Sequence, residues 1–207
     1  MFGTLAKFFV VLLLVVEPIG TIPVFAALTD RADPKWRRAM AIKACIIAAL
    51  VCIFFATGGA ILLRTLGISV DAFKIGGGIL LFLLSVEMVF ARPSGVRAMT
   101  SSEDVEAQHR TDISVFPIAF PLIAGPGVIA TILLAFADVP MTSVLFAGQI
   151  VVMLAVLAIT LALLLATGPV MRIVGQTGGA VLGRLLGVVL AALAVQFVLD
   201  GLRDALR

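Results

Sequence analysis

Long uncharged apolar tracts alternate with short polar segments along the chain. Three tracts contain no Asp, Glu, Lys or Arg, and each has at least 20 residues: 44–63, 113–137 and 139–171. About 20 predominantly apolar residues are needed to cross the hydrocarbon core of a bilayer as an α-helix. Followed along the whole chain, the pattern predicts six transmembrane helices. Their expected bounds, to within a few residues, are 5–29, 41–63, 70–91, 113–137, 142–168 and 179–200.

The composition agrees with a protein that lies in a membrane. Of the 207 residues, 62% are hydrophobic and 13% are charged, whereas about a quarter of the residues in soluble domains are charged. A chain with so little polar surface needs lipid around most of its exterior. We therefore predict an all-α polytopic membrane protein in which residues 1–207 form a single transmembrane domain surrounded by the lipid bilayer.

Residues that commonly bind metals or carry redox chemistry are few. Cys45 and Cys52 lie seven residues apart within one apolar tract, without CxxC spacing or neighbouring histidines, so we expect them to be packing residues. The single histidine, His109, lies in a polar stretch, and no ATP-binding motif is present. The sequence therefore predicts no enzyme activity, no metal, no cofactor and no nucleic-acid partner.

The basic residues are distributed unequally between the two sides of the predicted membrane domain. If the N-terminus lies outside, the connections after the first, third and fifth spans face the cytoplasm. With their flanks, they carry ten of the 15 basic residues: Arg31, Lys35, Arg37, Arg38, Lys43, Arg92, Arg97, Arg110, Arg172 and Arg184. The other side carries five: Lys7, Arg64, Lys74, Arg203 and Arg207. Because Lys and Arg accumulate in cytoplasmic loops, we predict a multi-pass inner-membrane protein with both termini in the periplasm.

Two short motifs recur between the halves of the chain. Pro18 and Pro23 lie five residues apart in the first span, and Pro121 and Pro126 repeat this spacing in the fourth. The third and sixth spans share a glycine followed nine residues later by a polar residue, as Gly78 with Glu87 and Gly187 with Gln196. Each half then holds three spans, and an odd number requires the halves to have opposite orientations in the membrane. This inverted repeat, with repeat one at 1–91, a cytoplasmic linker at 92–112 and repeat two at 113–207, is typical of many secondary transporters.

The prolines lie near the middle of the first and fourth spans, where they predict broken helices. Proline lacks a backbone N–H and clashes with the preceding turn, and a neighbouring glycine loosens the helix further. In the first span we expect Glu17-Pro18-Ile19-Gly20 to unwind and a new half-helix to begin at Thr21 or Ile22, with Thr21 as its N-cap. In the fourth span we expect the break at Ala124-Gly125, with Pro126 opening the next half-helix.

Two breaks at one depth predict a shared binding cavity. Unwound backbone is tolerated inside a membrane where it lines a cavity or is buried by protein. A helix that restarts there directs free N–H groups and the positive end of its dipole toward the cavity, which suits a carboxylate. Glu17 is the only charged residue between Lys7 and Asp30. A carboxyl at mid-membrane costs roughly 2.5–3.5 kcal/mol, so we expect Glu17 to face a substrate ammonium, a sodium ion or a proton; the alternative is a protonated side chain bonded to freed backbone.

Three motifs resemble those of the MarC family, which is also grouped with neutral amino acid transporters in a wider LysE-like superfamily. The motifs are Glu17-Pro18-Ile19-Gly20-Thr21-Ile22-Pro23, Lys74-Ile75-Gly76-Gly77-Gly78 and Pro121-Leu122-Ile123-Ala124-Gly125-Pro126-Gly127. The resemblance extends over essentially the whole chain. It implies six helices and the export or uptake of small neutral amino acids such as glycine or alanine.

Motifs and resemblance together predict a secondary transporter, ion-coupled or facilitative, with alternating access around the two breaks. The expected substrate-binding residues are Glu17, Pro18, Ile19, Gly20, Thr21, Pro23, Ala124, Gly125, Pro126 and Gly127. Candidates for coupling to a proton or sodium are Glu17, Glu87 and Gln196. Two alternatives stay open: a non-transporting scaffold or stress-tolerance protein whose breaks are packing kinks, and an exporter of other small solutes. Assembly into a homo-oligomer is also left open.

Overall fold

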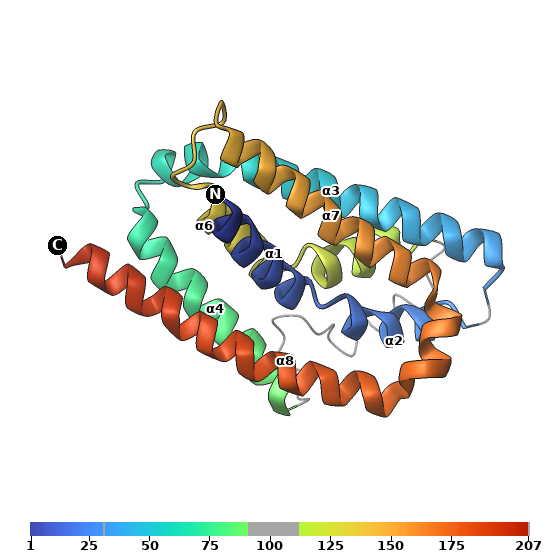
Figure 1. Ribbon diagram of the computed structural model, residues 1–207. Helices are drawn as coiled ribbons and strands as arrows, with labels where there is room; N and C mark the ends of the chain where they lie inside the picture. Colours follow the sequence, from blue (N-terminus) through green and yellow to red (C-terminus); the bar gives the residue numbers. More distant parts are fainter. Residues whose placement is uncertain (31, 91–111, 207) are drawn as a thin grey trace.

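The computed structural model describes residues 1–30, 32–90 and 112–206, so the predicted linker lies outside the described residues except for Asp112. The described residues are helical, without strands. The helices are α1 (Phe2–Val16), α2 (Pro18–Leu28), α3 (Pro34–Thr65), α4 (Val70–Phe90), the π-helix η1 (Ser114–Ile123), α6 (Pro126–Phe136), α7 (Val144–Leu165) and α8 (Thr167–Ala205) (Figure 1).

Five segments of the described chain are long and apolar enough to cross a membrane: Phe2–Leu28, Pro34–Thr65, Val70–Phe90, Val144–Leu165 and Val181–Ala205. The pair η1 and α6 gives a sixth when it is counted as one span with a bend of 57°. The predicted spans are thereby confirmed as candidate membrane helices, and an all-helical polytopic membrane protein is the fold class.

Two helices are longer than the sequence predicts. Helix α3 begins at Pro34 rather than near residue 41, because the carboxylate of Asp33 accepts hydrogen bonds from the backbone N–H of Lys35 (2.9 Å) and Trp36 (3.3 Å). This N-cap lets a polar turn continue into the apolar span. Helix α8 begins at Thr167 and is kinked at Gly175, whose φ of 63° is a left-handed conformation that glycine adopts readily.

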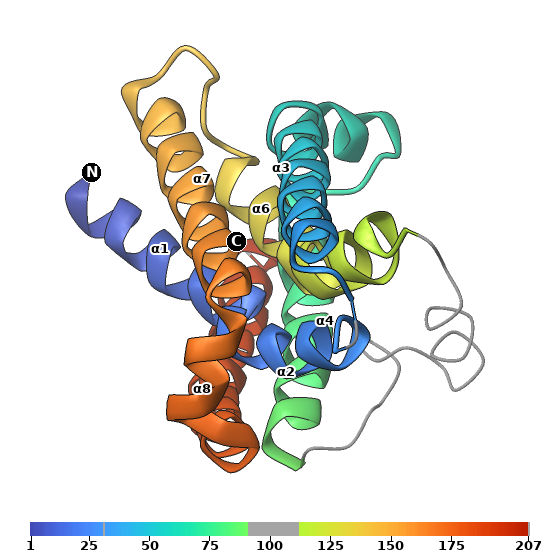
Figure 2. The ribbon, with the colours of Figure 1, turned by 90° about the vertical axis from the view of Figure 1, so that its right-hand side faces the viewer.

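The chain ends lie on the same side of the helical bundle. In Figure 1 both termini and the α3–α4 and α6–α7 connections lie toward the left, while the α2–α3 and α7–α8 connections lie toward the right. We call these the terminal end and the opposite end. The side view in Figure 2 shows α6 inside the bundle, where it contacts α1, α3 and α4.

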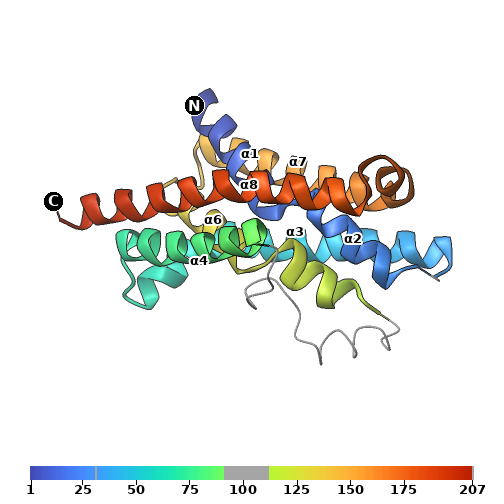
Figure 3. The same ribbon diagram turned by 90° about the horizontal axis from the view of Figure 1, so that it is seen from below.

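Helix α4 runs beside the C-terminal part of α8, as seen from the front in Figure 1 and from below in Figure 3. Glycines allow their close approach. A Cβ added at Gly78 of α4 would lie 2.8 Å from the carbonyl oxygen of Ala194, and one added at Gly187 of α8 would lie 2.8 Å from Met88 Cβ. Small residues at helix contacts are a common way to pack helices in membranes, where no hydrophobic force drives them together.

Candidate functional site

The first span is interrupted at a single residue. Glu17 has φ 48° and ψ 63°, a left-handed conformation that ends α1, and α2 begins at once with Pro18 at its first position. The backbone N–H of Glu17 still donates to Leu13 O (3.0 Å), and that of Thr21 donates to Glu17 O (3.2 Å). The prediction of a four-residue unwound segment was therefore wrong.

Thr21 is not the N-cap of the second half-helix. Its hydroxyl donates to the carbonyl oxygen of Glu17 (3.1 Å), one turn earlier in the same helix. A left-handed residue followed by proline is a compact way to end a helix, because proline cannot continue the hydrogen-bond ladder. The new half-helix therefore starts at Pro18, and Pro23 lies within α2.

At the second break, the new half-helix begins where the sequence predicts. Gly125 is the extended N-cap of α6, and Pro126 is its first residue. A Cβ at Gly125 would lie 2.4 Å from the carbonyl oxygen of Pro121, so only glycine fits there. The irregular backbone is longer than predicted, because Phe116 and Phe120 within η1 also have non-helical angles.

The second break lies next to α1 inside the bundle. A cavity of about 10 Å³ lies between α1 and the second break. Its lining consists of Val15, Leu84, Pro121, Leu122, Gly125, Pro126, Gly127 and Val128. A cavity needs roughly 10–15 Å³ to hold one water molecule, so in this conformation the cavity at the second break is of the size of a single water.

Three predicted site residues line this cavity, namely Gly125, Pro126 and Gly127. Ala124 is buried beside them without being part of the lining. The first-span candidates contribute no lining residue: Glu17, Pro18, Ile19, Gly20, Thr21 and Pro23. Sequence reasoning missed Val15 and Leu84, whose apolar side chains carry no signal apart from their position in a span.

The Glu17 carboxyl faces α8 instead. A Cβ at Gly183 of α8 would lie 2.9 Å from Glu17 Oε1, and a Cβ at Gly20 of α2 would lie 2.6 Å from the same oxygen. The carboxyl thus occupies a recess that both glycines leave open. Sequence reasoning also missed Gly183, although Gly179, Gly183 and Gly187 form a four-residue repeat of small residues that is typical of close helix contacts.

Both half-helices begin without a side-chain cap. No side-chain cap hydrogen bond forms at Glu17, which precedes α2, or at Gly125, which precedes α6. The first N–H groups of a helix have no acceptor within it. In α6 these groups include those of Gly127 and Val128, both of which line the cavity. The positive end of the α6 dipole is therefore directed at the cavity.

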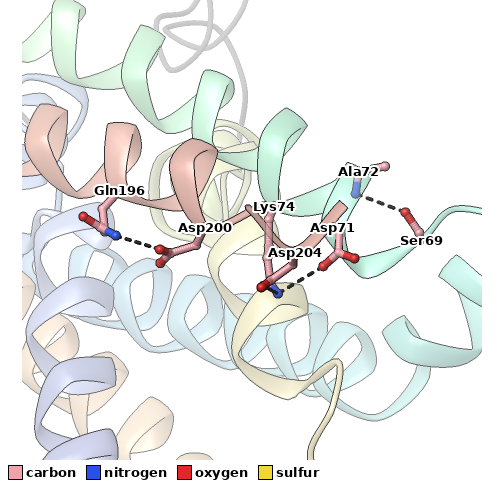
Figure 4. A network of polar contacts seen from close by, with 7 residues as sticks. All are labelled: Ser69, Asp71, Ala72, Lys74, Gln196, Asp200 and Asp204. Atoms are coloured by element: carbon pink, nitrogen blue, oxygen red, sulfur yellow. Dashed lines mark hydrogen bonds and ion pairs between the residues drawn. The ribbon is translucent and has the colours of Figure 1, made fainter. Parts of the chain in front are cut away.

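The two other coupling candidates lie apart from this cavity. Gln196 is exposed on α8 and donates its amide to Asp200 Oδ1 (2.7 Å) (Figure 4). Glu87 is half-buried near the end of α4. The structure does not place either residue in the lining of this cavity.

Polar contacts tie the ends of the spans together. At the opposite end, Lys43 of α3 forms an ion pair with Asp112, which precedes η1. Asp112 also accepts hydrogen bonds from the Ser114 hydroxyl (2.6 Å) and backbone N–H (2.9 Å). The Lys43 ammonium and these bonds lower the pKa of the Asp112 carboxyl to about 2. At the terminal end, Lys74 of α4 bridges two aspartates, as Figure 4 shows.

Cys45 and Cys52 are buried free thiols on α3. Within the described ranges, no group of three or more His, Cys, Asp or Glu side chains is arranged to hold a metal ion.

Comparison with known proteins gives a family match over nearly the whole chain. The model described as MarC family integral membrane protein matches residues 2–206. A UPF0056 membrane protein of Methanocaldococcus jannaschii is 37% identical over 193 residues, covering 93% of this chain and 92% of its own length. The UPF0056 inner membrane protein YhgN of Escherichia coli is 33% identical over 195 residues (94% and 93%). The UPF0056 membrane protein YvbG of Bacillus subtilis is 31% identical over 203 residues (98% and 96%). No solved structure matches.

Proposed function

This chain belongs to the MarC family of integral membrane proteins, and we propose that it is a secondary transporter of small neutral amino acids such as glycine or alanine. It would lie in the inner membrane, because its relative YhgN is named an inner membrane protein. Both termini would lie in the periplasm. Its spans would form two inverted repeats, at 1–91 and 113–207, with alternating access between them.

The proposal rests on the second break, where the start of α6 lines a cavity next to α1. Gly127 and Val128, whose N–H groups have no acceptor within α6, line a cavity together with Val15 and Leu84. Preorganised N–H groups in a low-dielectric site stabilise a carboxylate far better than they do in water. Nearby side chains leave little room, because a Cβ at Gly127 would lie 3.1 Å from Leu84 and 3.3 Å from Val15. Small substrates fit such a site better than large ones.

The size of this cavity implies movement during transport. A space of about 10 Å³ holds one water and no amino acid. We therefore take this conformation as one that is closed around the break. Binding would require α1 and α6 to separate near Val15 and Gly127. A transporter needs such a closed state, because a site open to both sides at once would leak.

Contacts between α4 and α8 support the inverted repeat. Gly78 is closest to Ala194 and Val198, while Gly187 is closest to Met88 and also contacts Val89 and Ser85. Gly78 and Gly187 are 109 positions apart in the sequence. The same separation relates Ser85 to Ala194 and Val89 to Val198. The two helices thus use corresponding residues to contact each other in both directions, as two related elements packed about a two-fold axis do.

In our proposal Glu17 binds the coupling proton or ion rather than the substrate. Its carboxyl lies against Gly183 of α8 and outside the cavity that faces α6. It is therefore placed to couple the first break to movement of α8. Glu17→Gln keeps the shape of the side chain and removes its charge. We expect the variant to exchange substrate and to lose accumulation against a gradient. Asp138→Asn, at an exposed carboxylate in the α6–α7 connection, serves as the control.

Counterflow in proteoliposomes across a panel of amino acids tests the transport function. Wild-type protein should exchange labelled glycine or alanine and should discriminate against large or charged amino acids. No exchange of any amino acid would refute the proposal and favour a scaffold or stress-tolerance role; exchange of other small solutes alone would favour an exporter of those. If Glu17→Gln binds substrate roughly ten- to hundredfold more weakly, as loss of a charge-assisted hydrogen bond predicts, the residue contacts substrate and the coupling assignment is wrong.

A further inference from the structure

A larger cleft, open to the surface, lies at the terminal end between α4, α6 and α8. Its volume is about 360 Å³, and cavities that bind small molecules usually have about 300–1,000 Å³. Its lining consists of Lys74, Leu134, Phe197, Asp200, Arg203 and Asp204. We call it the vestibule. Unlike the cavity at the second break, it has room for an amino acid without any change of conformation.

One positive charge of the vestibule is already neutralised. The Lys74 ammonium lies 2.9 Å from Asp204 Oδ2 and 3.2 Å from Asp71 Oδ1 (Figure 4). These ion pairs hold the start of α4 against the end of α8. They form a fixed wall of the cavity rather than a site for an added charge.

A second pair of opposite charges is arranged differently. Arg203 makes no ion pair with any residue in the part of the chain that the structure describes, and Asp200 accepts one hydrogen bond, from the amide of Gln196. The two residues are three positions apart on α8, so their Cβ atoms lie about 5–6 Å apart on one helix face. Arg203 is exposed and Asp200 is half-buried. The Asp200 carboxylate and the Arg203 guanidinium thus lie side by side, and each can form an ion pair with a ligand.

We propose that the vestibule binds the zwitterion of an α-amino acid before it enters the bundle. The ammonium group pairs with Asp200, the carboxylate pairs with Arg203, and the side chain lies against Phe197 and Leu134. An α-amino acid suits this arrangement because its two charges are separated by one carbon atom. The identity of the ligand rests on the proposed function, whereas the position of the site rests on the vestibule itself.

Helix α6 links the vestibule to the second break. Leu134 lies eight residues after Pro126 in the same helix, a distance of about 12 Å along its axis. A ligand in the vestibule therefore contacts the helix whose first turn faces the closed cavity. The vestibule would act as the entry site on the side of the chain termini.

Protection of an introduced cysteine tests the vestibule without requiring transport. Leu134→Cys is placed in the full chain with Cys45→Ala and Cys52→Ala, in nanodiscs of phosphatidylglycerol, which offers no zwitterionic headgroup. Alanine should slow modification by a methanethiosulfonate reagent, whereas acetate and methylammonium, which carry one charge each, should not. Phe197→Cys is the second reporter if Leu134→Cys does not fold.

Charge-neutralising variants then test the two contacts. Asp200→Asn and Arg203→Gln should each raise the half-protecting alanine concentration about two- to fivefold, as expected for exposed ion pairs. Arg64→Gln is the control, because this exposed arginine ends α3 at the same end of the bundle outside the vestibule. Equal protection in all three variants, or protection by acetate alone, would overturn the proposal.

Counterflow of alanine by the same protein separates this proposal from the transport function. Counterflow without protection refutes the vestibule and leaves transport standing. Protection without counterflow supports the vestibule and refutes transport. The absence of both refutes both.

Discussion

The reciprocal glycine contacts of α4 and α8 make a quantitative prediction. A Cβ at Gly78 would lie 2.8 Å from the backbone oxygen of Ala194 and 3.1 Å from the backbone nitrogen of Val198, where ordinary contacts begin at 3.4 Å. The helices must therefore move apart by about 0.6 Å. Because a backbone cannot turn aside as a flexible side chain does, we expect Gly78→Ala to lower the free energy of unfolding by about 1–3 kcal/mol, the usual cost of overpacking.

Gly187→Ala should have a similar effect, because its Cβ would lie 2.8 Å from Met88 Cβ and 3.2 Å from the backbone oxygen of Ser85. Each variant has a matched control on its own helix. Gly76 on α4 and Gly179 on α8 have no atom within 4 Å of an added Cβ. Alanine at either position should leave stability unchanged or raise it by up to about 1 kcal/mol, since alanine favours helices over glycine.

The assay is reversible unfolding in mixed micelles, with helix content followed by circular dichroism as the denaturing detergent increases. Both interface variants should unfold at lower detergent fractions than both controls. If only one interface variant is destabilised, the contacts are not equivalent and the argument for related halves loses its support. If neither interface variant is destabilised, the close approach of α4 and α8 is wrong.

Two further predictions concern the Glu17 recess and the orientation of the chain. Gly183→Ala should displace the Glu17 carboxyl and reduce substrate accumulation with little change in stability, because only the end of a flexible side chain has to move; Gly179→Ala, with open space around it, should accumulate substrate normally. In intact cells, an impermeant thiol reagent should modify a cysteine at position 142, in the exposed α6–α7 connection, and not one at position 32, between α2 and α3; the reverse pattern would contradict periplasmic termini.

Properties that depend on local sequence were predicted well. The spans follow from length and hydrophobicity, and the start of α6 follows from Pro126, whose fixed φ and missing N–H suit the first position of a helix. The same rule applies equally to Pro18 and to Pro23. Sequence alone did not decide between them, because the choice depends on Glu17 adopting a left-handed conformation against α8.

The candidate site was predicted in part for a related reason. Gly125 to Gly127 lie in the cavity because they belong to the restarting helix itself. The direction of the Glu17 side chain depends on Gly183, which is 166 residues later in the chain. Such a contact follows from how α8 packs against α2, and no pattern within the first span contains it. The charged vestibule was missed because its residues come from three separate helices.

The two breaks differ although their prolines have the same spacing. In the first span the helix restarts at the first proline, Pro18, whereas in the second it restarts at the second proline, Pro126. Suppose that the two halves are related and inverted. A conformation in which their breaks differ then has a counterpart, in which the first half adopts the break of the second and the second half adopts the break of the first. Halves of opposite orientation would make that counterpart open toward the other side of the membrane. Under the proposed inverted repeat, unequal breaks are what alternating access requires of a single conformation, because equal breaks would leave the two sides of the membrane equivalent.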